Sequence, residues 1–200
     1  MINANQLDLS KTTLVTIDLQ EGFRNFKLAP HSLTEMVTRA NKINTALEGS
    51  SALITLISVW PKTVAQMLTN DAATAKLLNE NPPENFTDLL MDVATKPTSN
   101  PVIKITKDAP SAFFDTNLES QLRANNIETI ILLGVATSVG VFTTAIDAYQ
   151  NGYNVIVVED ASTDTDEELH QVFFNKMFEK CTQVVSTDEI IQAIKTAKSR

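Results

Sequence analysis

Short apolar runs rich in β-branched residues alternate along this sequence with segments of helical periodicity. The runs typical of buried strands are 14–19, 52–60, 102–106, 129–133, 154–158 and a short one at 184–185. Apolar residues spaced three to four apart predict helices at 33–47, 118–124, 138–151 and 166–178, and a last helix opens at Thr187. Few folds accommodate such a regular alternation.

Strands that alternate with helices are joined by crossover connections, which make the strands parallel and place helices on both faces of the sheet. The sequence therefore predicts an α/β fold with three layers, α/β/α. We expect a mostly parallel, six-stranded, Rossmann-like sheet with helices on both faces. The first helix carries clear boundary signals, because Ser32 and Glu35 have the spacing of a capping box and Gly49 follows its last apolar residue.

Residues 62–100 have the weakest pattern. Short helical stretches at 64–68, 72–78 and 86–93 are interrupted by Pro82 and Pro83, and the segment ends in a proline-flanked turn at 97–101. The apolar content of this segment is too thin for a core of its own. We therefore predict one domain over residues 1–200, in which 62–100 is an elaborated connection that lies over the functional site.

The composition disfavours several classes of protein. With 16 Lys and Arg against 24 Asp and Glu, the net charge is −8, so neither nucleic acid nor an anionic membrane surface is an expected partner. One cysteine cannot form an internal disulfide and is typical of a reducing compartment, so we expect a cytoplasmic protein. No apolar run approaches ~20 residues and no basic-then-apolar leader is present, so we expect neither a membrane span nor a signal peptide.

Ligands of parallel α/β sheets bind beyond the carboxyl ends of the strands, and polar residues mark three of these ends. Asp18 closes the first strand, Lys107 follows the third, and the glycine-containing segment 134–140 follows the fourth. A lysine facing Asp18 would lower the pKa of its carboxyl group, whereas burial would raise it. Backbone N–H groups of 134–140 would favour an anion or a developing oxyanion.

Each of these features also has a structural interpretation. In this interpretation, Asp18 caps a loop or pairs with a structural base, and Lys107 is a solvated surface charge. Gly134 and Gly140 serve close packing at a turn from strand to helix.

Three motifs lie at these strand ends. Residues 18–23 read DLQEGF, of the form D-x-Q-x-x-F, and Lys107 precedes Ser111-Ala-Phe113 in the spacing K-x-x-x-S-A-F. Residues 134–145 read GVATSVGVFTTA, which matches G-V-x-T-x-x-C-V-x-x-T-A except that Gly140 replaces the cysteine. In this order, over roughly residues 12–190, the motifs resemble those of the isochorismatase-like hydrolases, also called the cysteine hydrolase family.

The resemblance implies roles for individual residues. Asp18 would be the acid/base carboxylate, Lys107 its charged partner, and the amides of Ala136 and Gly140 the oxyanion hole, with a non-proline cis peptide between Val135 and Ala136. The family's nucleophilic cysteine aligns with Gly140, which has no side chain, so an acyl-enzyme cannot form there. Cys181 lies far downstream, and we interpret it as a packing residue.

Further candidates for substrate binding are Gln20, Phe23, Trp60, Phe113 and Thr137. Core packing explains the three aromatic residues equally well, and Thr137 or its neighbour Ser138 is also suited to cap a helix. We expect no metal and no cofactor. Metal-binding relatives carry Asp-x-His after the second strand, where this chain reads Ser58-Val-Trp-Pro61, and neither of its two histidines fits that pattern.

The sequence supports two main hypotheses. In the first, the chain is a hydrolase that acts on a small metabolite by general acid/base catalysis at Asp18, with enol-ether hydrolysis as the candidate reaction, because isochorismatases proper resemble it in having glycine at position 140. In the second, it is a non-catalytic small-molecule-binding member that has lost the nucleophile.

Two features argue against isochorismate itself as the substrate. Ala136 stands where isochorismatases tend to have tyrosine, and residues 61–100 hold no arginine for substrate carboxylates, only Lys62, Lys76 and Lys96. The resemblance also implies a homo-oligomer, a dimer or larger, and a third hypothesis limits the protein's role to such assembly.

Overall fold

The computed structural model describes residues 7–200, so the first six residues of the predicted domain lie outside it. Its six-stranded sheet has the order β3-β2-β1-β4-β5-β6, and each neighbouring pair is parallel. The strands are β1 (Thr12–Ile17), β2 (Leu53–Val59), β3 (Val102–Lys107), β4 (Thr129–Val135), β5 (Asn154–Thr163) and β6 (Gln183–Val185). The predicted α/β fold is confirmed, and the sheet is fully parallel among the strands described.

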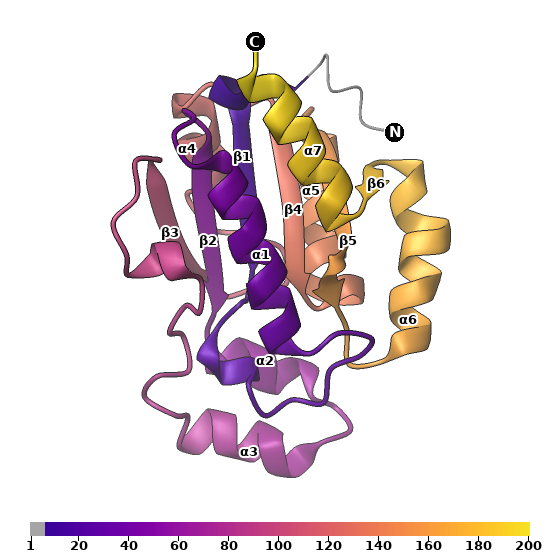
Figure 1. Cartoon of the computed structure of the whole chain (residues 1–200). Coiled ribbons are helices and arrows are strands. Elements are labelled where there is room, and N and C mark those ends of the chain that lie inside the picture. Colours follow the sequence, from indigo (N-terminus) through magenta and orange to yellow (C-terminus); the bar gives the residue numbers. More distant parts are fainter. Residues whose placement is uncertain (1–6) are drawn as a thin grey trace.

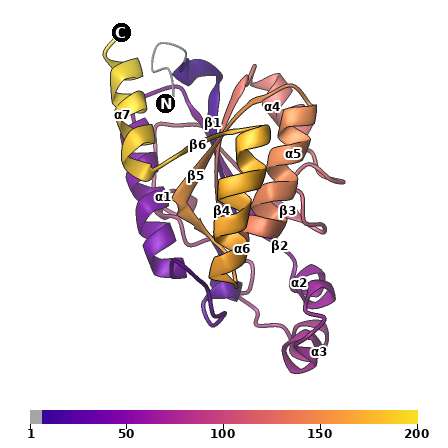
Figure 2. The same ribbon diagram turned by 90° about the vertical axis from the view of Figure 1, so that its right-hand side faces the viewer.

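Helices cover both faces of the sheet (Figures 1 and 2). On one face lie α1 (Leu33–Leu47) and α7 (Thr187–Lys198), and on the other α4 (Leu118–Ala124), α5 (Phe142–Gln150) and α6 (Glu167–Val172). Side chains alternate across a strand, so Leu14 joins the core beneath α1 while Val15 joins the core beneath α5. Burial on both faces explains why the central strands are continuous apolar runs.

The boundary signals of α1 act as the sequence indicates. The Ser32 hydroxyl accepts a hydrogen bond from the Glu35 amide, and the Glu35 carboxylate accepts one from the Ser32 amide. Gly49 follows the helix with φ +74°, a conformation that side chains disfavour. No helix within residues 7–200 is both long enough and apolar enough to cross a bilayer.

The connection after β2 forms α2 (Pro61–Met67) and α3 (Ala72–Glu80), which lie beyond one end of the sheet (Figure 1). The predicted helix at 86–93 is wrong: this stretch has only a 3₁₀ turn at Asp92–Ala94. Its backbone forms hydrogen bonds with another segment instead. The carbonyl oxygen of Phe86 accepts from the Gly22 amide, and that of Asp88 accepts from the Glu21 amide. The Leu90 amide donates to the carbonyl oxygen of Leu19. Those bonds tie it to the chain just after β1.

Three other boundaries differ from the sequence prediction. β5 continues past Val158 to Thr163, with a register irregularity against β4 between Leu132 and Gly134. A π-helical turn (Thr137–Val141) precedes α5, and the predicted helix 166–178 becomes α6 followed by a π-helical turn (Phe173–Met177) and a 3₁₀ turn (Phe178–Lys180). The longer β5 matters most, since it carries Asp164 to the carboxyl ends of its neighbours.

Candidate active site

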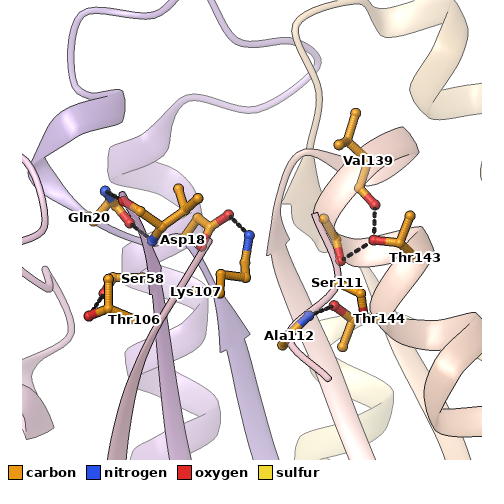
Figure 3. A network of polar contacts seen from close by, with 12 residues as sticks. Asp18, Gln20, Ser58, Thr106, Lys107, Ser111, Ala112, Val139, Thr143 and Thr144 are labelled. Carbon is orange, nitrogen blue, oxygen red and sulfur yellow. Dashed lines mark hydrogen bonds and ion pairs between the residues drawn. The ribbon is translucent and has the colours of Figure 1, made fainter. Parts of the chain in front are cut away.

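The structure brings three predicted residues together at the carboxyl ends of the strands. Asp18 follows β1, Lys107 ends β3, and Gly140 lies in the turn after β4. Lys107 Nζ donates to Asp18 Oδ2 at 2.8 Å, and the residues are only 1% and 4% exposed (Figure 3). A Cβ placed on Gly140 would lie 3.5 Å from the same Asp18 oxygen. Asp18 is therefore flanked by an ammonium group and by a backbone with no side chain.

The Asp18 carboxyl group is held in an unusual environment. Its residue has φ +55°, a left-handed conformation that aspartate tolerates better than most residues, and its amide donates to Ile57 O. Oδ1 is buried without a hydrogen-bond partner among the described residues. Burial raises the pKa of Asp18 to about 6, against the opposing attraction of Lys107. This carboxyl group thus changes protonation state close to neutral pH.

The backbone between β4 and α5 passes close to Asp18. At Gly134, φ is +134° and a Cβ would lie 2.1 Å from Ile17 O, so glycine is required for β4 to approach β1 there. The Val135–Ala136 peptide is cis, as the resemblance of the motifs to the family implies. The assignment of the Ala136 and Gly140 amides to an oxyanion hole stays a prediction.

A cavity of about 230 Å³ opens beside Asp18 and Lys107. Phe23 and Phe26 contribute from the loop after β1, α2 and the residues after it cover another side, and the turn after β4 and the start of α6 complete the walls. The other lining residues are Val64, Met67, Leu68, Pro110, Val135, Ala136, Ser138, Val139, Gly140, Asp164, Thr165 and Leu169. Phe23 is therefore the predicted binding residue that the structure places in the wall.

Gln20, also predicted to bind substrate, is not part of this wall. Its Nε2 atom donates to the carbonyl oxygens of Val59 and Phe86, and its Oε1 atom accepts from the Val59 amide (Figure 3 shows Gln20 beside Asp18). The fully buried side chain ties the ends of β1 and β2 to the connecting segment. In the structure, Gln20 therefore holds these segments in position and offers no surface to a substrate.

The remaining predicted binding residues also lie outside the cavity lining. Trp60 precedes α2 and is 46% exposed, and the ring of Phe113 packs 6.1 Å from that of Tyr153. Thr137 is fully buried, and its hydroxyl bonds His170 Nδ1 at 2.8 Å. The hydroxyls of Thr137 and Ser138 do not cap the turn that they begin, which differs from the sequence interpretation.

Asp164 is a charged lining residue that the sequence analysis did not assign to the site, because an acid before a helix is also explained as a charge favoured by the helix N-terminus. It is 2% exposed, and its two carboxylate oxygens accept from the amides of Ser138 and Thr165, both at 2.7 Å. Its backbone pairs in both directions with Ala29. Asp18 was predicted as a site residue because it directly follows a strand. Asp164 also directly follows a strand, but the predicted strand ended at Val158, so this position was not recognised.

Cys181 lies far from this site. It lies two residues before β6, and because the strands described are all parallel, it lies at the edge of the sheet opposite the carboxyl ends. Burial raises the pKa of its thiol. Within residues 7–200, no group of three or more His, Cys, Asp and Glu side chains is arranged to hold a metal ion.

Comparison with known proteins identifies the family to which this chain belongs. The isochorismatase domain matches residues 12–189, and the chain belongs to the isochorismatase family. The Escherichia coli O157:H7 isochorismatase family protein YecD is 35% identical over 193 residues, which cover 94% of this chain and 99% of that protein. YwoC of Bacillus subtilis (strain 168), of the same family, is 29% identical over 199 residues, covering 98% and 100%.

The fold agrees with this assignment. The structure of an isochorismatase family protein from Burkholderia thailandensis matches with a TM-score of 0.77 and 27% identity, over 94% of this chain and 97% of that one. The similarity therefore extends over almost the whole length of both chains.

Proposed function

We propose that this protein is a hydrolase that acts on a small metabolite by general acid/base catalysis at Asp18, without a cysteine nucleophile. The observation that carries the proposal is the environment of Asp18, which lines the cavity. Its Oδ2 atom accepts a hydrogen bond from Lys107, and its buried Oδ1 atom has no hydrogen-bond partner among the described residues. A carboxyl group with a pKa of about 6 suits proton transfer, because catalytic efficiency is greatest when the pKa lies near the working pH.

Enol-ether hydrolysis is the candidate reaction. Protonated Asp18 gives its proton to the terminal enol carbon, where the electron pair of the double bond forms the new C–H bond and leaves an oxocarbenium ion. Water adds to this ion and loses a proton to the Asp18 carboxylate, which gives a hemiketal. The hemiketal then breaks the C–O bond to the former ether oxygen, and its hydroxyl proton is transferred to that oxygen, so an alcohol and a carbonyl product form. Lys107 stabilises the carboxylate that exists between the two proton transfers.

The surroundings of Gly140 support a route without covalent catalysis. Glycine offers no nucleophile, and even a Cβ at this position would be closely packed, 3.0 Å from Ile17 Cγ2 and 3.2 Å from Val135 O. Cys181 sits at the opposite edge of the sheet and takes no part.

Asp18→Asn tests the proposal, because asparagine keeps the shape of the side chain and cannot transfer the proton. Turnover on a panel of amides, esters and enol ethers should fall about 10²–10⁴-fold on each compound that the wild-type protein hydrolyses. Asp92→Asn, at an exposed surface ion pair, is the matched control and should retain activity. Turnover that Asp18→Asn leaves unchanged would overturn the assignment.

A non-catalytic binding protein is the second candidate. The glycine at position 140, where the signature motif has cysteine, favours it, since a pocket can persist after the nucleophile is lost. This candidate predicts ligand binding without turnover across the same panel. Multiple turnovers on any compound would eliminate it.

We also propose that the chain forms a homo-oligomer of two or more copies. Exposed apolar side chains, among them Phe114 at 67% exposure and Tyr149, support this proposal. Light scattering coupled to size-exclusion chromatography measures the mass directly, and a monomer at high concentration would refute it.

A further inference from the structure

We propose that the cavity beside Asp18 selects an uncharged small molecule with an apolar body and a single polar head, and that it discriminates against carboxylates. This inference rests on the proposed function only because it takes the cavity as the substrate site. It concerns the charge and size of the ligand, which the proposed acid/base chemistry leaves open.

The charges of the lining residues carry the first part of the inference. Among the described residues of the wall, the charged side chains are Asp18, Lys107 and Asp164, a formal sum of −1. Lys107, the cation of this set, is already paired with Asp18 at 2.8 Å. While Asp18 is ionised, a ligand carboxylate would give up its hydration on entry and meet no unpaired cation in the wall. Such a burial is costly, so the cavity discriminates against anions.

Asp164 strengthens this discrimination. Its carboxylate lies in the wall and is fixed by the Ser138 and Thr165 amides, so it cannot rotate away from an incoming anion without breaking those bonds. Two of the backbone N–H groups at the cavity are thereby engaged by a protein carboxylate and are not available to a ligand carboxylate. Uncharged ligands avoid this repulsion.

The carboxyl group of Asp18, which lines the cavity, defines the polar head. Its Oδ1 atom is buried and has no hydrogen-bond partner among the described residues, and a hydrogen bond from a ligand would satisfy it. An ionised Asp18 accepts from a ligand N–H or O–H group, and a protonated Asp18 donates to a ligand oxygen. An amide or an alcohol satisfies Oδ1 in either state without adding charge.

The walls and volume define the apolar body. Phe23, Phe26, Val64, Leu68 and Val139 present aromatic and aliphatic surface to the cavity. Its volume of about 230 Å³ is below the roughly 300–1,000 Å³ of pockets that hold drug-sized ligands. A single ring or a short branched chain with one polar substituent matches these dimensions.

Benzamide and benzoate are matched probes, because they share a ring and nearly the same shape and differ in charge at neutral pH. Calorimetry on the wild-type protein should show benzamide binding at least about tenfold more tightly than benzoate. Val139→Phe, which fills the cavity, should abolish benzamide binding and so locate it. Equal or tighter binding of benzoate would overturn the proposal, and so would the absence of binding by both probes.

Met67→Arg tests the role of charge by supplying the missing cation. Met67 lines the cavity, is 40% exposed and ends α2, where a helix favours positive charge. Benzoate affinity should rise at least about tenfold, whereas Met67→Gln, the uncharged control, should leave it unchanged. Unchanged benzoate affinity in Met67→Arg would contradict the proposal.

These binding measurements separate the two proposals. Benzamide preference without turnover on any panel compound would support the ligand class and refute the catalytic role. Asp18-dependent turnover of compounds that carry carboxylates would support the catalytic role and refute the ligand class.

Discussion

Lys107 Nζ lies 2.8 Å from Asp18 Oδ2, although β2 lies between the strands that end at these two residues. The long lysine stem spans the intervening strand end, and both side chains are removed from solvent. Buried charges lose their hydration, so each of these two depends on the other for compensation. Consequences for stability follow from this dependence.

Lys107→Met should destabilise the protein strongly at neutral pH. The substitution keeps most of the length of the side chain but leaves a buried carboxylate unpaired, which typically costs about 3–5 kcal/mol of unfolding free energy. The loss should be smaller in acid, where Asp18 takes up a proton. Urea denaturation at two pH values measures both effects. Lys96→Met, which breaks the exposed Lys96–Asp92 pair, should cost no more than about 1 kcal/mol.

The pH dependence of stability should report Asp18 directly. Its folded pKa of about 6 exceeds the ordinary value of 3.8, so the folded state holds this proton more tightly than the unfolded state. The resulting stabilisation is present below about pH 4 and is lost as the pH rises through 6, by about 3 kcal/mol. Asp18→Asn lacks this loss, so its stability relative to wild type should rise between these pH values. Parallel curves for the two proteins would contradict the assignment.

His170 should contribute with the opposite sign. Burial lowers its pKa to about 4, and nearby His31 adds to the shift while Asp164 opposes it. The unfolded state then binds the proton more tightly, so stability decreases as the pH falls from about 6.5 to about 4. In His170→Asn this component should disappear, which thermal denaturation over that pH range measures. An unchanged acid sensitivity would show that His170 does not titrate in this range.

Gly134→Ala should destabilise the protein more than the same change at Gly49. Both glycines have positive φ, but a Cβ on Gly134 would lie 2.1 Å from Ile17 O, whereas nothing lies within 4 Å of one on Gly49. Gly49→Ala should therefore cost about 1–2 kcal/mol, for the left-handed conformation alone. Gly134→Ala carries a backbone clash in addition, so its loss of unfolding free energy should be clearly larger. Equal costs would show that β4 shifts away from β1 without penalty.

The core of the candidate site was predictable because the geometry of parallel sheets is general. Asp18, Lys107 and Gly140 each follow an apolar run, and parallel strands bring such ends to one edge. Asp164 was not assigned to the site because Glu159 and Asp160 interrupt the apolar pattern of β5, although the strand continues through them. Propensity alone does not reveal such an extension, since pairing with β4 supports it.

The segment 86–93 and Gln20 show a different limit. Whether 86–93 forms a helix depends on a partner distant in sequence, because its backbone bonds residues 19–22 instead. The place of Gln20 in the motif predicts a binding residue, yet its side-chain amide is hydrogen-bonded to the backbone of Val59 and Phe86. Local patterns do not specify contacts between segments more than sixty residues apart.

The Gln20 contacts join the connecting segment to the carboxyl ends of β1 and β2. The connecting segment is fastened at its start, where the Trp60 amide donates to Lys107 O, and again at Phe86, where Gln20 holds the carbonyl. Between these two points lie α2, which supplies part of the cavity wall, and α3, which does not line the cavity, and neither helix contains Asp18 or Lys107. We expect substitutions and length changes around α2 to alter what the pocket admits while the acid and its counter-charge stay in place. New ligand preferences can therefore arise here without rebuilding the proton-transfer apparatus.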